Sequence, residues 1–255
     1  MDQITIGYHV GSVTRTERPG RTGVGTEMRL PVCHAGVVDE TGHVRSYNAR
    51  RGRMSALTME RVESLFPRHH IPDGPLDPAA AFDRVAPVVL EIGCGHGAAA
   101  VAYAETHPGH DLLAVDVFTP ALARMLAEAD RRGVRNLWLH QGDAVALLRD
   151  RIAPGALAAV HLFFPDPWPK AKHAKRRFLA PYTLDLIASR LVPGGHLLVA
   201  TDHETYAVHA RAELAAHPRF AVTEGERPAW RPRDGFEAKG LAAGRRVTEF
   251  RADLV

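Results

Sequence analysis

Short apolar runs alternate with amphipathic stretches along most of the chain. The apolar runs predict five strands, at residues 88–92, 112–115, 137–140, 158–164 and 196–200. The stretches between and after them have helical spacing and predict helices at residues 97–105, 120–132, 145–149, 181–190 and 205–215. Because helices and strands alternate in this way, the pattern predicts an α/β fold with a doubly wound sheet of parallel strands.

The region before the predicted sheet lacks this alternation. Residues 1–44 contain scattered Gly, Thr and Arg and predict a variable, loosely ordered N-terminal extension. Residues 45–80 form a basic segment in which residues 58–66 predict a short helix that ends before Pro67. Three prolines and a glycine within residues 72–78 mark a boundary, so we expect one α/β domain over residues 81–255.

Composition sets the outer limits of what the chain can be. Its 255 residues are 45% apolar, which suits one full core, and a net charge of +3 requires any nucleic-acid affinity to come from local clusters. Cys33 and Cys94 match no disulfide or metal spacing and the histidines do not cluster as ligands, so no metal is expected. Because the chain has neither a membrane-spanning apolar run nor a secretion signal, we expect a soluble, cytoplasmic protein.

The sequence Phe163-Phe164-Pro165-Asp166-Pro167-Trp168-Pro169-Lys170 places a carboxylate beside a run of cations. Its prolines predict a stiff loop at the carboxyl end of a buried strand, where open α/β sheets bind ligands, so Asp166 is expected in the active cleft. Five of the eight residues 170–177 are Lys or Arg, which suits phosphate contacts, although a solvated basic helix start has the same composition. The pairing indicates chemistry on a nucleic acid. The basic cluster at residues 45–55 is either a second such contact or a linker.

A glycine-rich stretch, Glu91-Ile-Gly-Cys-Gly-His-Gly97, follows the first predicted strand. Glycines there allow a tight turn and a close approach of a ligand to the main chain. They fit NAD as well as S-adenosylmethionine, because Gly93, Gly95 and Ala98 also satisfy the G-x-G-x-x-A pattern. A carboxylate at Glu91 would repel a pyrophosphate and attract sulfonium and ammonium groups, and therefore favours S-adenosylmethionine.

Two further acids follow the next two predicted strands. Asp116 can accept hydrogen bonds from ribose hydroxyls, and Asp143 can accept one from the exocyclic amine of an adenine. Any one acid of this kind is more often a surface residue or a helix cap. Three carboxylates at three consecutive strand ends together predict a site for a methyl donor.

With these motifs the chain resembles the class I S-adenosylmethionine-dependent methyltransferases, and more narrowly the bacterial tRNA (guanine(46)-N7)-methyltransferases. The resemblance covers about residues 45–250 and is most specific at residues 163–177. Arg45-Ser46 with Gly52-Arg53, Thr201-Asp202 and Thr248-Glu249-Phe250 also resemble family motifs. The resemblance implies a Rossmann-like, mostly parallel sheet of seven strands, a catalytic domain at residues 81–255, and methyl transfer from S-adenosylmethionine to N7 of guanosine 46 in the variable loop of tRNA.

The resemblance and the motifs together assign roles to individual residues. The catalytic candidate is Asp166, and cofactor contacts are expected from Glu91, Gly93, Gly95, Asp116, Asp143 and Asp166. Substrate contacts are expected from Lys170, Asp202, Thr248, Glu249 and Phe250, and RNA contacts from Lys172, His173, Lys175, Arg176 and Arg177. One departure stands out: the family pattern ends Thr-x-Phe-Glu, whereas Arg251 follows Phe250 here. A guanine-binding carboxylate is therefore missing at that position, and Glu249 is a candidate substitute.

For the expected methyl transfer, the protein mainly has to position the donor and the guanine and exclude water. N7 of guanine has a lone pair and no proton, so in-line methyl transfer needs no general base. Asp166 would stabilise the positive charge that develops on the ring, while Asp202 and Glu249 would accept hydrogen bonds from N1 and N2. Trp168 either stacks on the base or packs the loop onto the sheet.

Other classes of protein share parts of this pattern. An NAD-dependent oxidoreductase would have the glycines and Asp116, but the chain shows no hydride-transfer constellation and the basic loop would be unexplained. A methyltransferase acting on adenine or cytosine usually has an Asn/Asp-Pro-Pro-Tyr/Phe loop, which is not found here. A noncatalytic RNA-binding protein, or an enzyme acting on a different RNA, would keep the cations and tolerate Arg251. We expect no obligate protein partner and either a monomer or a homodimer.

Overall fold

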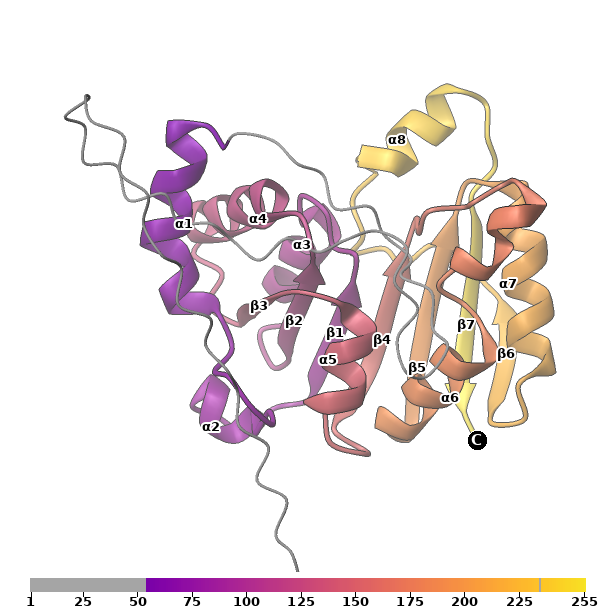
Figure 1. The fold of residues 1–255 in the computed structure, drawn as a ribbon, viewed down its shortest axis with the longest axis horizontal. Coiled ribbons are helices and arrows are strands. Elements are labelled where there is room, and N and C mark those ends of the chain that lie inside the picture. The colour runs from indigo at the N-terminus through magenta and orange to yellow at the C-terminus, as the bar shows by residue number, and fades with distance from the viewer. Residues whose placement is uncertain (1–53, 234) are drawn as a thin grey trace, which may run out of the picture. The chain divides into compact units, whose positions relative to one another are not determined.

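The computed structural model describes residues 54–233 and 235–255, which fold around a seven-stranded sheet (Figure 1). The strands lie in the order β3-β2-β1-β4-β5-β7-β6. Strands β1 to β5 are parallel, and β7 runs antiparallel to β5 and β6. The doubly wound, mostly parallel sheet is thus confirmed. Its strands are β1 Val88–Ile92, β2 Asp111–Asp116, β3 Leu137–Gln141, β4 Leu157–Phe163, β5 Leu191–Thr201, β6 Phe220–Glu224 and β7 Thr248–Leu254.

Helices cover both faces of the sheet, because successive strand residues point to opposite sides. Leu112 and Ala114 of β2 pack in a core with α1, α3 and α4, whereas Leu113 and Val115 pack in a second core with α5, α6 and α7. The helices are α1 Ala56–His69, α2 Pro78–Phe82, α3 Ala98–Thr106, α4 Thr119–Arg132, α5 Ala144–Asp150, α6 Pro181–Arg190, α7 Glu204–Ala216 and α8 Gly235–Ala242, with a 3₁₀ helix η1 at Ala171–Arg176.

Helix α1 continues past the proline at which it was expected to end. Pro67 lies in its last turn, and the prediction of an end before Pro67 is wrong. The helix is extended by one backbone bond from His70 to Phe66 (2.8 Å), and the His69 ring bonds to the Leu137 carbonyl oxygen at the start of β3 (2.8 Å). Tertiary anchoring therefore outweighs the single hydrogen bond that proline removes.

The N-terminal extension, residues 45–53 of the basic cluster and the motifs Arg45-Ser46 and Gly52-Arg53 lie outside the described residues. Within the described part of the chain, no helix is both long enough and apolar enough to cross a membrane.

The chain reverses its winding direction between β1 and β4. From β1 it proceeds outward to β2 and β3, then returns to β4 on the other side of β1. In open α/β sheets such a switch point forms a crevice beyond the carboxyl ends of the strands, where ligands bind. The Gly-rich stretch after β1 and the Asp166 loop after β4 therefore lie at neighbouring strand ends, and Figure 1 shows α8 beyond this edge of the sheet.

Candidate active site

The Gly-rich stretch turns sharply from β1 into α3. Gly93, Gly95 and Gly97 all have positive φ angles, of 69°, 55° and 75°, which side chains other than glycine rarely adopt. A Cβ atom on Gly97 would lie 2.1 Å from Cγ of Met125, so α3 packs directly against α4 at this point. The turn leaves Gly93 exposed at the end of the strand. The sequence is thus folded into an open backbone cradle.

Glu91 lies on β1 just before this cradle and is almost fully buried, with 3% of its surface exposed. Its Oε2 atom has no hydrogen-bond partner, and the closest ring nitrogen is Nδ1 of His161, 3.9 Å away on β4. Burial raises the pKa of Glu91 to about 8, against the opposing charge of Arg231. Burial lowers the pKa of His161 to about 3, so His161 is neutral and supplies no cation. The Ala100 amide bonds to this carboxyl group, but its buried Oε2 atom stays unpartnered, which is costly without a ligand and suits a cationic one.

Asp116 and Asp143 both accept hydrogen bonds from backbone amides. Asp116 bonds to the amides of Gly95 and Phe118, each at 2.8 Å, and thereby ties the Gly-rich turn to the end of β2. Asp143 caps α5, with both bonds, from Val145 and Ala146, made by its Oδ1 atom. Asp116 ends β2, which lies beside Glu91's strand, and Asp143 follows β3 on the far side of β2, so the three acids share the carboxyl edge of the sheet.

The loop that carries Asp166 has an unusual backbone. Phe164 and Trp168, on either side of Asp166, have positive φ angles of 51° and 41°, and Asp166 itself is exposed. Positive φ is strained for residues with side chains and persists only where the surroundings enforce it. At its start the loop is tied to β5, because the Phe164 amide donates to the Ala200 carbonyl oxygen at 2.7 Å.

Two arginines of the basic run secure the other end of the same loop. Arg177 donates to the carbonyl oxygens of Pro167 and Trp168, each at 3.2 Å. The guanidinium group of Arg176 lies 4.9 Å from the centre of the Trp168 ring. The indole nitrogen of Trp168 is buried without a partner, so this structure has the tryptophan packing within the loop.

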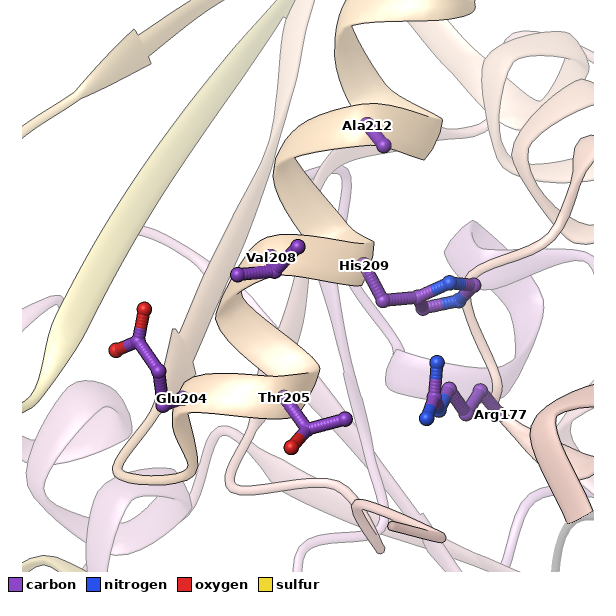
Figure 2. Close-up of a pocket in the computed structure, with 6 residues that line it drawn as sticks. All are labelled: Arg177, Glu204, Thr205, Val208, His209 and Ala212. Carbon is purple, nitrogen blue, oxygen red and sulfur yellow. The ribbon is translucent and has the colours of Figure 1, made fainter. Parts of the chain in front are cut away.

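The basic run is therefore divided into two sets of side chains. Lys170, Lys172 and Lys175 are exposed on and before η1, whereas Arg176 and Arg177 are partly buried against the loop. His173 contacts the Trp168 ring edge-on, at 5.6 Å between ring centres. Figure 2 shows Arg177 beside α7, where it lines a pocket of about 440 Å³ with Glu204, Thr205, Val208, His209 and Ala212.

The substrate residues expected near the C-terminus are largely paired or buried. Asp202 is bonded to Arg245, with an N–O distance of 2.7 Å, and Glu249 is bonded to the buried Arg231. Phe250 is 2% exposed in the core, and Thr248 pairs with Thr201 across β5 and β7. Arg251 forms an ion pair with Asp253 on the same strand. The substrate roles of these residues stay predictions.

The structure also brings two residues to the site that the sequence analysis did not select. Arg231 and Glu237 are each 2% exposed and form an ion pair at 3.1 Å. The sequence did contain a signal for Glu237. Phe236-Glu237 is the one Phe-Glu pair in the sequence, and the family motif Thr-x-Phe-Glu ends in that pair, whereas Phe250 is followed by Arg251. Glu237 is thus a second candidate for the guanine-binding carboxylate.

Comparison with known proteins is consistent with this geometry. A family model described as a putative methyltransferase matches residues 85–250. A tRNA (guanine-N(7)-)-methyltransferase of Mycobacterium avium is 49% identical over 183 residues, covering 70% of this chain and 71% of that protein. The protein of the same name in Bordetella pertussis is 43% identical over 213 residues, covering 82% and 84%. That of Nitrosomonas eutropha is 38% identical over 212 residues, covering 81% and 95%.

Proposed function

Because this chain belongs to the tRNA (guanine-N7)-methyltransferase family, we propose that it transfers a methyl group from S-adenosylmethionine to N7 of guanosine 46 in the variable loop of tRNA. We propose further that it acts in the cytoplasm, as a monomer or homodimer without an obligate protein partner. The observation that carries the proposal is the position of Glu91, buried with an unpartnered Oε2 atom, on β1 beside the strand that leads into the Asp166 loop.

The residues after β1, β2 and β3 fit an adenosine-containing, cationic methyl donor. Glu91 would face the cationic groups, and the turn at Gly93 and Gly95 would let the donor approach the backbone. Asp116 would accept bonds from the ribose, and Asp143 from the adenine. When bound, S-adenosylmethionine supplies an electrophilic methyl group on its sulfonium.

The residues after β4 and along the C-terminal segment would hold the guanine. Asp166, on a loop whose backbone is held at both ends, would stabilise the positive charge that N7 methylation places on the base. Lys170 would contact the substrate nearby. Either Glu237 or Glu249, with Asp202, would accept hydrogen bonds from N1 and N2 once the ion pairs with arginine rearrange. The exposed lysines of the basic run would bind tRNA phosphates.

The test is transfer of labelled methyl from S-adenosylmethionine to an unmodified tRNA transcript, with the site mapped by the chemical lability of N7-methylguanosine. We expect label at position 46 and none in a control transcript with adenosine there. Label at another guanosine or in another RNA would show that guanosine 46 of tRNA is not the substrate. Donor binding without transfer to any RNA would favour the noncatalytic, RNA-binding alternative.

A further inference from the structure

Arg231 is a buried arginine that contacts the start of the Asp166 loop. It is 2% exposed and is one of the largest fully buried side chains. Its Nε lies 3.2 Å from Oε2 of Glu237 on α8, and its Nη1 lies 3.0 Å from Oε2 of Glu249 on β7. A second guanidinium nitrogen also bonds to Glu249, so this pair is bidentate. Arg231 therefore joins α8 to β7.

The same guanidinium group also touches the start of the Asp166 loop. Its central carbon lies 4.7 Å from the centre of the Phe163 ring and 5.4 Å from that of Phe164. Phe164 is the residue with positive φ two positions before Asp166. A planar cation over two aromatic rings, fixed by two carboxylates, is well suited to hold that strained backbone in place.

The neighbouring Trp230 anchors this contact on its other side. Its ring stacks on His161 of β4, with 5.3 Å between ring centres and 24° between planes, and meets Tyr103 of α3 edge-on at 4.9 Å. The segment before α8 is thus pinned to the strand from which the Asp166 loop leaves. Arg231 has little room to move independently of β4.

Arg227 offers an internal comparison. Its Nε atom lies 2.7 Å from Oε1 of Glu237, so it pairs with the same carboxylate as Arg231. It is more exposed, with 24% of its side chain accessible, and among the described residues it is not placed over Phe163 or Phe164. Arg227 also donates a hydrogen bond to the Arg231 carbonyl oxygen, so it shares the surroundings of Arg231 but not the contact with the two rings.

We propose that Arg231 is a positioning residue that couples the C-terminal carboxylates to the Asp166 loop, so that the base-reading end of the site and the loop are held in one arrangement before the guanine binds. This inference rests on the proposed function for its catalytic meaning. Its structural part, the hold on Phe163 and Phe164, stands without it.

The experiment compares Arg231→Lys with the matched control Arg227→Lys. Lysine keeps the charge beside the two carboxylates, which avoids leaving them buried and unpaired, but it cannot hold two carboxylates and two rings at once. At saturating donor and tRNA we expect Arg231→Lys to lower kcat per folded molecule by about tenfold, and Arg227→Lys by less than about twofold. Donor affinity should stay within about twofold of wild type in both variants, because lysine keeps the positive charge that Arg231 exerts on Glu91 and neither side chain lies on the Gly-rich turn.

A second measurement follows the loop without using activity. The Phe164 amide is hydrogen-bonded to Ala200, so its hydrogen exchange reports on the start of the loop. We expect exchange there to be about tenfold faster in Arg231→Lys than in Arg227→Lys, with equal exchange in β2. A purely structural arginine would lower thermal stability without this local difference.

Equal kcat and equal Phe164 exchange in the two variants would overturn the inference. If wild-type protein transfers no methyl group, the proposed function fails instead, and the exchange measurement still decides whether Arg231 holds the loop. Should Arg231→Lys fail to fold, Phe163→Leu removes one ring from beneath the guanidinium while leaving both ion pairs. That variant should show the same faster exchange at Phe164, and unchanged exchange would refute the proposed contact.

Discussion

The two halves of the crevice hold their acids in opposite ways. After β1, β2 and β3, Asp116 and Asp143 accept bonds from backbone amides, and Glu91 is buried with an unpartnered oxygen. Beyond β5, on α8 and on β7, the carboxylates of Asp202, Glu237 and Glu249 are each paired with an arginine. In the first half the buried Glu91 forms no ion pair with a lysine or arginine among the described residues, whereas each of these three acids in the second half does.

This difference indicates what each half requires from its ligand. A cationic methyl donor can supply the charge that Glu91 lacks, at little cost in rearrangement. A guanine brings neutral N–H donors, which must compete with guanidinium groups already bonded to the carboxylates. We therefore expect the donor half to be sensitive to protonation and the substrate half to be sensitive to geometry.

The largest effect is expected at Asp166, on the loop after β4, which we assign to the substrate half of the crevice. Asp166→Ala should keep the fold, because the side chain is exposed, and should lower methyl transfer by about a hundredfold to a thousandfold by removing charge stabilisation at the base. Asp166→Asn removes the negative charge but keeps a hydrogen-bond acceptor, so comparing the two variants separates the effect of the charge from that of hydrogen bonding. Single-turnover rates with saturating donor are the measurement, and a rate equal to wild type in the alanine variant would refute a catalytic role.

The two halves of the site also differ in how well they could be predicted from the sequence. Strands β1 to β5 and the acids at the ends of β1 to β3 were predictable because apolar runs, glycines and helix caps are local signals, whereas β6 and β7 were not located; Asp143 is indeed a cap as well as a site candidate. The pairing of Arg231 with Glu249 was not predictable, because it depends on β7 lying beside β5 and on α8 lying beyond the strand ends. The continuation of α1 through Pro67 has the same kind of cause, since contacts with β3 override a local stop signal.

The next effect tests the unpaired acid of the donor half. With the pKa of Glu91 at about 8, the ligand-free protein carries a proton there at neutral pH, and a cationic donor favours the ionised form. Donor affinity should therefore rise by about fiftyfold from pH 6 to pH 8 and level off above that, with proton release on binding. Calorimetry in buffers of different ionisation enthalpy measures both quantities.

Glu91→Gln is the control for that titration. Glutamine cannot ionise, so the variant should bind the donor weakly at every pH and lose the pH dependence. The stability of the fold should respond in the opposite direction: a raised pKa in the folded state makes wild-type protein lose stability as the pH rises from about 4.5 to about 8, and the glutamine variant should not. An identical pH profile in both proteins would mean that another group controls binding.

The smallest effect separates the lysines of the basic run from its arginines. Lys172 and Lys175 are exposed, whereas the guanidinium groups of Arg176 and Arg177 contact the loop, so we expect the lysines to act on tRNA alone. Lys172→Ala with Lys175→Ala should weaken tRNA binding by about tenfold and reduce the slope of log affinity against log salt by about 1.5, with donor affinity unchanged. A matched pair, Arg135→Ala with Arg219→Ala, removes two exposed cations that precede β3 and β6 at the opposite end of the sheet, and should change neither quantity. Equal salt slopes in the two double variants would mean that the lysines form only a solvated surface, and that the RNA is bound elsewhere.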